Sequence, residues 1–133
     1  MTDLEKVVWE WCTAASPLHT EISGRMWTPI AHPKFKNDSG NGSIVFHKQN
    51  SRTHPTGAMH SPVYVFKCYG GTDDPDDARK VSRLLYDRIH HANGATDSGR
   101  IVTAEVVGGG GVQKEPDTKF WADISIYQIL IEG

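Results

Sequence analysis

Apolar positions recur at helical spacing near the start of the chain. The stripe consists of Leu4, Val7, Val8, Trp11, Cys12 and Ala15. Recurrence at i, i+3, i+4 and i+7 predicts an amphipathic helix over about residues 3–15. Thr2 and Glu5 have the spacing of a capping box, and Pro17 is expected to stop the helix. Trp9 lies off the apolar stripe, so we expect it to be partly exposed.

A second helix is indicated most clearly by its start. Asp74 suits the N-cap, Pro75 suits the first helical position, and the aspartates at 76–77 face the positive end of the helix dipole. Its apolar stripe consists of Ala78, Val81, Leu85, Ile89 and Ala92. The dipeptide Asn93-Gly94 is a typical stop signal. Helix start signals explain the acidic run without any catalytic role.

Four longer segments have the composition of strands. They cover residues 43–49, 62–69, 99–107 and 119–131, and a short extended piece lies near residues 24–27. The predicted order is α-β-β-β-α-β-β, without the βαβα alternation of a parallel sheet. This order predicts an α+β fold with a mainly antiparallel sheet of about four to five strands and two helices on one face. Residues 1–133 are expected to form a single domain.

The last strand has two unlike faces. One face carries Phe120, Ala122, Ile124, Ile126 and Leu130, and the other carries Trp121, Asp123, Ser125, Tyr127, Ile129 and Ile131. The second face becomes apolar only towards the end of the strand. We therefore expect cover on both sides there, by a helix on one face and by a neighbouring subunit on the other.

Composition excludes several classes of protein. Of 133 residues, 38% are hydrophobic and 23% charged, as in ordinary water-soluble domains. No apolar run approaches the roughly 20 residues of a membrane span, and the acidic N-terminus is unlike a signal peptide. We expect a protein made inside a cell, without a membrane partner. Cys12 and Cys68 form no CxxC motif, so buried reduced thiols are expected.

Charge is unevenly distributed, although the net charge is only −2. Lys34, Lys36, Lys48 and Arg52 form a basic stretch, and residues 73–77 form an acidic one. Two interpretations remain open: opposite ends suited to head-to-tail assembly, or two solvated loops. Lys34-Phe35-Lys36 is the only basic and aromatic combination of the kind that binds nucleic acid.

A search for chemistry finds no catalytic set. The tetraglycine, Gly108, Gly109, Gly110 and Gly111, lacks the spacing of a phosphate loop and precedes no helix signal. A flexible turn or an interface loop is the favoured interpretation. The seven histidines lack the close spacing of zinc ligands. We therefore expect no enzyme activity, cofactor or metal; a small metal- or ligand-binding domain remains the weaker alternative.

The order of elements resembles the tail-completion or tail-terminator proteins of long-tailed bacteriophages, which join head and tail. The matching features are the first helix, residues 24–27, the strand at 63–69, the arginine-containing helix from Asp76, the strand from Arg100 and the last strand through Tyr127. The longer basic loop at 32–42 and the tetraglycine depart from that pattern. The resemblance covers nearly the whole chain, but it rests on order and spacing rather than on a catalytic motif.

The resemblance implies a structural virion subunit. Such a subunit forms a ring, usually of about six copies, that caps the tail tube, joins it to the head connector or stopper protein and lets DNA pass without specific binding. It implies a place in the tail or neck of a virion assembled in the host cytoplasm. A head-closure or adaptor protein of the same neck is the alternative. The expected subunit or partner contacts are Trp9, Lys34, Phe35, Lys36, Arg52, Gly108, Gly109, Gly110, Gly111, Trp121 and Tyr127.

Overall fold

A computed structural model describes residues 3–28, 42–50, 59–116 and 120–132. Three helices occur in this part of the chain, namely α1 (Asp3–Thr13), α2 (Pro17–Ile22) and α3 (Pro75–Ile89). The strands are β1 (Met26–Trp27), β2 (Ser43–Asn50), β3 (Met59–His60), β4 (Val63–Tyr69), β5 (Gly94–Ala95), β6 (Arg100–Lys114) and β7 (Trp121–Glu132). None of the described helices is long and apolar enough to cross a membrane.

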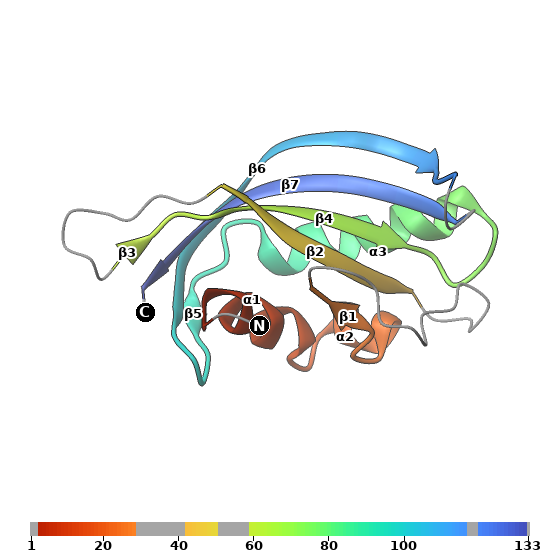
Figure 1. Ribbon diagram of the computed structural model, residues 1–133. Coiled ribbons are helices and arrows are strands. Elements are labelled where there is room, and N and C mark those ends of the chain that lie inside the picture. Colours follow the sequence, from red (N-terminus) through yellow and green to blue (C-terminus); the bar gives the residue numbers. More distant parts are fainter. Residues whose placement is uncertain (1–2, 29–41, 51–58, 117–119, 133) are drawn as a thin grey trace.

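One sheet contains all of these strands. Its order is β1-β2-β4-β7-β6-β5, and β3 pairs with β7 outside this path. Only β1 and β2 run parallel; the other pairs are antiparallel. The long strands β6 and β7 arch over the rest of the molecule (Figure 1). The predicted α+β class with a mainly antiparallel sheet is therefore confirmed.

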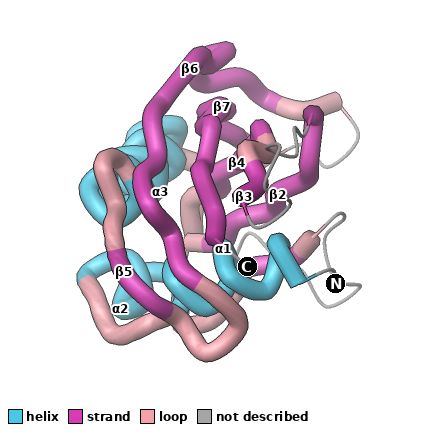
Figure 2. Tube along the Cα trace, turned by 90° about the vertical axis from the view of Figure 1, so that its left-hand side faces the viewer, coloured by secondary structure: helices cyan, strands magenta, loops and turns pink. Residues whose placement is uncertain are grey.

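The helices pack on one face of the sheet, where the main core forms. Figure 2 shows them gathered to one side of the strands. Alternate residues of each strand point into this core, and the aromatic ones stack on one another. Phe46 and Phe66 have ring centroids 5.5 Å apart, and Tyr127 meets Phe66 edge-on at 5.5 Å. The predicted two faces of the last strand are confirmed, because Tyr127, Ile129 and Ile131 are all buried on the helix side.

The start of α3 follows the sequence signals. Asp74 is the N-cap and accepts a hydrogen bond from the Asp76 N–H at 2.9 Å, while Pro75 takes the first position. The helix nevertheless ends at Ile89, before the predicted Asn93-Gly94 stop. His91 adopts a left-handed backbone with φ of 59°, and its N–H donates to the Ala104 carbonyl at 2.7 Å. This bond to β6 turns the chain away from the helix axis.

The prediction of two helices was wrong, because Pro17 begins a helix as well as ending the previous segment. Ser16 caps α2 and accepts from the His19 N–H at 3.2 Å. Leu18 and Ile22 on this short helix are fully buried. A proline is compatible with the first helical position because its missing N–H has no partner there. The first helix accordingly ends at Thr13.

The predicted number of strands was also too low. Four to five were expected, and the described residues form seven. The two-residue strands β1, β3 and β5 are too short to give a periodic signal. The predicted strand at 99–107 continues to Lys114 as β6, so the tetraglycine lies in a strand and not in a turn. Gly108, Gly109 and Gly111 pair with β7, which keeps this segment in the sheet although glycine by itself disfavours strands.

Candidate assembly surface

The face of the sheet opposite the helices, called the outer face below, carries two partly exposed isoleucines, Ile124 and Ile126. Val65 pairs with Ile126, and Lys67 pairs with Ile124, so these four side chains share that face. Neither isoleucine is fully buried, although both lie near the middle of a long central strand. Central strands normally have both faces covered or present a polar outer face. An apolar outer face of this kind is typical of a protein-binding surface.

The second half of β6 is the most exposed strand segment in the described chain, and residues 105–114 are called the distal β6 segment below. Glu105 to Gly111 are all exposed. Val106 and Val107 are exposed by 42% and 53%, although both are large and apolar. Two adjacent exposed valines on a strand expose more apolar surface than a solvated strand requires.

One edge of the distal β6 segment has no strand beside it within the described residues. On the other edge the segment pairs with β7 throughout. β5 covers the outward edge of β6 only at Arg100 and Ile101, and His91 covers it at Ala104. From Glu105 onwards the outward N–H and C=O groups face away from the sheet. Such an edge is a template for pairing with another chain.

Two of the four glycines are required by the fold, and two are not. A Cβ on Gly109 would lie 2.9 Å from the Ile124 carbonyl oxygen, and Gly111 has φ of +71°. A Cβ on Gly108 or Gly110 would meet only ordinary contacts, at 3.6 Å from Ile126 Cδ1 and 3.8 Å from Ile124 Cβ. The absence of side chains at 108 and 110 therefore leaves the two isoleucines and the strand backbone open to close approach from outside.

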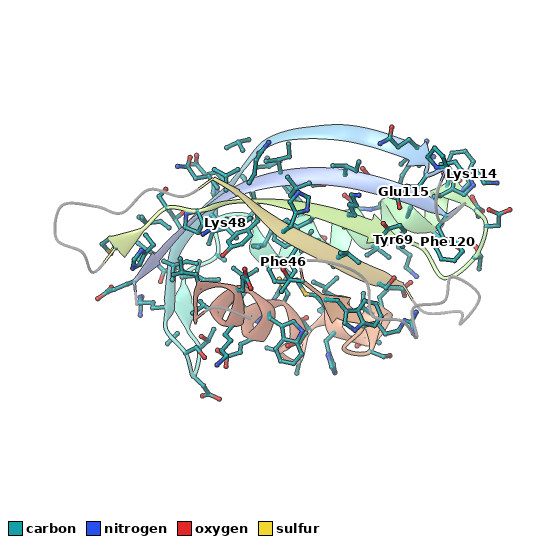
Figure 3. The ribbon with its side chains drawn as sticks, viewed as in Figure 1. Phe46, Lys48, Tyr69, Lys114, Glu115 and Phe120 are labelled. Carbon is teal, nitrogen blue, oxygen red and sulfur yellow. The ribbon has the colours of Figure 1, made fainter. Side chains whose placement is uncertain are left out.

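A polar network fixes the far end of the β6–β7 hairpin. Glu115 follows β6 and its carboxylate accepts hydrogen bonds from Lys67 Nζ at 3.1 Å and from the Tyr69 hydroxyl at 2.5 Å. Glu115 also donates its N–H to the Phe120 carbonyl at 2.9 Å. Figure 3 shows Glu115, Tyr69 and Phe120 gathered at this end of the sheet. Burial, together with the adjacent Glu115, raises the pKa of Tyr69, so its hydroxyl remains a donor.

Lys114 attaches the same end of the hairpin to the start of α3. Its ammonium lies 3.8 Å from an Asp73 carboxylate oxygen and 5.7 Å from the centroid of the Trp121 ring. These contacts are exposed, so each contributes little stability. Together with the Glu115 network they hold the far end of the hairpin against β4 and the start of α3. The tetraglycine therefore lies between this end and the first part of β6, which β5 and His91 cover.

A shallow hollow of about 240 Å³ lies on the outer face beside the exposed valines. Its lining residues are Ser61, Thr103, Glu105, Gln128 and Leu130. The Gln128 amide donates to the Ser61 hydroxyl at 2.8 Å, so two polar groups of the hollow already bond to each other. No group of three potential metal ligands occurs among the described residues. Neither the hollow nor its lining has the arrangement of a nucleophile and a base.

The two cysteines are fully buried free thiols, as the sequence predicted. Burial raises the pKa of Cys12 to about 12 and raises that of Cys68 well above its usual value. A thiol with a raised pKa is a poor nucleophile. Ser82 and Ser125 lie between α3 and β7, with hydroxyl oxygens 3.0 Å apart. This pair joins helix to sheet.

The structure places the residues expected at contacts in different environments. Trp9 is half-buried, as expected, and its indole N–H donates to the Met26 carbonyl at 3.0 Å. Trp121 is half-buried beside Lys114. Tyr127 is only 1% exposed and belongs to the core, which leaves almost none of its side chain for a contact with another chain. Gly108 to Gly111 lie together in the distal β6 segment. Lys34, Phe35, Lys36 and Arg52 lie outside the described residues.

Sequence reasoning missed the residues that define this surface. Val106 and Val107 precede the glycines and gave an ordinary strand signal. Their exposure follows from the edge position of β6, which depends on pairing with a strand further along the chain. The adjacency of two valines, which point to opposite faces of a regular strand, was the one available signal. Glu115 and its partners Lys67 and Tyr69 are more than 40 residues apart in sequence, so no local pattern could join them.

Comparison with known proteins shows a shared fold. No protein-family model matches the chain, and no curated protein matches it. Among solved structures, it is similar to a chain from the structure described as "Virion of native gene transfer agent (GTA) particle". The TM-score is 0.69 at 15% sequence identity, and the alignment covers 98% of this chain and 95% of the other. The likeness therefore extends over nearly the full length of both chains.

Proposed function

We propose that this chain is a structural subunit of a phage-like particle and that it acts by assembly rather than by catalysis. The observation that carries the proposal is the full-length fold match to a chain of a gene transfer agent virion. The distal β6 segment supports it, since an exposed strand edge with two exposed valines suits protein contacts. The raised thiol pKa values and the shallow hollow provide no competing catalytic centre.

Within such a particle, we propose the role of a tail terminator. Copies would form a ring of about six that caps the tail tube, contacts the head connector or stopper protein and lets DNA pass. The order of elements that resembles this family supports the assignment. A ring also needs two different, complementary surfaces on each subunit, and the long strands β2 and β6, which only the two-residue strands β1 and β5 border, offer two unlike edges. The net charge of −2 suits passage of DNA without tight binding.

Particles produced from a genome lacking this chain test the assignment. A tail terminator stops growth of the tail tube, so its loss should give tails of variable and excessive length, separate from filled heads. Electron microscopy measures the length distribution directly. Supplying the wild-type chain from a second gene should restore a single tail length.

The alternative neck position gives a different outcome. If the chain were a head-closure or adaptor protein, its loss would leave tails of normal length and heads that cannot retain DNA. Particles of normal length and normal infectivity or transfer would contradict both positions, and with them the proposed structural role.

A further inference from the structure

We infer that copies of this chain join edge to edge, with the β2 edge of one copy pairing antiparallel with the distal β6 segment of the next. The inference rests on the proposed function, because it specifies how the assembling copies meet. It concerns two parts of the sheet that lie at opposite ends of the path β2-β4-β7-β6. Each end has backbone groups directed away from the sheet.

Hydrogen bonds within the chain show which groups point outwards. The Ile44 N–H donates to the Arg25 carbonyl of the β1 segment at 3.0 Å, so Ile44 faces the outer edge of β2. The ladder to β4 is regular from Ser43 to Lys48. By strand alternation, Phe46 and Lys48 therefore also direct their N–H and C=O groups outwards. β1 also pairs with this edge at Val45, and a parallel pairing at that position uses the Phe46 N–H, so the outward groups of Lys48 are the ones that no described strand covers.

The same reasoning applies to β6. The Ala104 carbonyl accepts the outward bond from His91, and the ladder to β7 is regular from Thr103 to Val106. Val106 is the next outward-facing residue by alternation. The backbone N–H and C=O of Val106 can therefore bond to a strand of another chain, at the point where the distal β6 segment begins.

The two edges have matching faces. Phe46 pairs with Phe66 and Lys48 with Tyr64, while Val106 pairs with Tyr127, so the outward-facing residues of both edges lie on the helix face. Opposed residues in an antiparallel pair have side chains on the same face. β2 and β6 also run in opposite directions, because three antiparallel pairings separate them. A β2–β6 join therefore continues the sheet and keeps the helices of every copy on one side.

Charge and shape select a second copy as the partner. The uncovered part of β2 carries His47 and Lys48 and no acidic residue, whereas the distal β6 segment begins with exposed Glu105. Lys48 lies on the helix face and Glu105, which pairs with Gln128, on the outer face, so their opposite charges favour the approach of the two edges and not a direct cross-strand pair. Each edge thus prefers the other edge to itself, which favours head-to-tail joining over a symmetric dimer. Val106 and Val107 would lose their exposure in the join.

The bulges in β6 limit where the join forms. The register against β7 shifts between Val106 and Gly108 and again between Gly109 and Gly111. Bulges bend a strand and interrupt its edge. A straight partner strand therefore pairs at the Val106 end of the segment, and the glycines leave room for the bodies of adjacent copies to approach.

Proline substitutions test the join, because proline removes one outward N–H without removing a ladder bond inside the chain. Val106→Pro blocks the β6 edge, and Lys48→Pro blocks the β2 edge. We expect each variant alone to have the mass of a single chain by native mass spectrometry. Mixed together, the two should form a one-to-one heterodimer that grows no further, because each retains one complementary edge. Val106→Thr and Lys48→Arg keep the N–H, and Lys48→Arg also keeps the positive charge, so both should assemble like the wild type.

Three outcomes overturn the inference. Assembly of Val106→Pro at wild-type mass would contradict edge pairing while leaving the proposed function intact. Homodimers of Lys48→Pro would indicate symmetric β6–β6 pairing instead. A wild-type chain that stays single at high concentration and is also absent from purified particles would overturn this inference and the proposed function together.

Hydrogen exchange of the wild-type assembly gives a second measurement, independent of whether the proline variants fold. The amides of Lys48 and Val106 should exchange quickly in the dilute single chain and at least tenfold more slowly in the assembly. Equal exchange rates at these two amides in the two states would overturn the inference. The Ile126 amide, inside the sheet, provides the reference.

Discussion

Two neighbouring glycines of β6 should respond oppositely to the same substitution. Gly109→Ala places a Cβ at 2.9 Å from the Ile124 carbonyl oxygen, a backbone atom fixed by the sheet. Gly108→Ala places a Cβ at 3.6 Å from Ile126 Cδ1, which is ordinary van der Waals contact. The two variants differ by one position and share the same chemical change, so each is the control for the other.

The expected free energies follow from these distances. Forcing an extra methyl group against fixed backbone costs roughly 1–3 kcal/mol of unfolding free energy. Where the new side chain fits, Gly→Ala stabilises by about 0.4–1 kcal/mol, because it reduces the freedom of the unfolded chain. The two variants should therefore differ by about 1.4–4 kcal/mol. With a urea m-value of about 2 kcal/mol/M, the unfolding midpoints separate by roughly 0.7–2 M.

Urea unfolding followed by tryptophan fluorescence measures this difference, at a concentration where light scattering gives the mass of one chain. Equal m-values in the two variants would confirm that only the native state has changed. Equal midpoints for Gly108→Ala and Gly109→Ala would refute the reasoning, because they would show that the distal β6 segment is not held against β7 as described. Gly108→Ala is also expected to weaken assembly, since it covers part of the proposed contact surface.

Three further predictions concern the body of the fold. Asp74→Ala should lower the unfolding free energy by about 0.5–2 kcal/mol through loss of the α3 cap, and Asp74→Asn should restore most of it in thermal melts. Burial raises the pKa of the Glu10 carboxyl, but hydrogen bonds from Thr96 and Ser98 outweigh burial and hold that pKa below its usual value of 4.5. The unfolding free energy should therefore fall as the pH drops from 4.5 through the lowered pKa. Glu10→Gln should flatten the fall in urea midpoints between pH 5 and pH 3. Cys12 and Cys68 should resist a thiol reagent in the native protein and both react in urea; fast labelling of either native thiol would contradict their burial.

Features set by local chemistry could be predicted from the sequence. The start of α3 needs only Asp74 and Pro75, and both act within one turn of the helix. The two faces of β7 follow from alternation, since Ser125, Tyr127, Ile129 and Ile131 are buried on one of them. The mainly antiparallel sheet follows from the order of the elements.

Features set by distant partners could not be predicted. The glycines of β6 have low strand propensity, and the pairing of Gly108, Gly109 and Gly111 with β7 places the segment in the sheet. The end of α3 depends on a bond from His91 to Ala104, which lies on another element. Tyr127 has the amphipathic character of a contact residue, yet Phe66 and the helices bury it. The candidate surface was therefore only partly anticipated, through the tetraglycine.

The measurement that tests the central claim most directly is the native mass of the chain, alone and together with the tail-tube protein of its particle. The proposed role predicts a closed ring of equal copies, about six, bound to the end of the tube or formed upon it. A chain that remains single at every concentration, and that does not bind the tube protein, would contradict it.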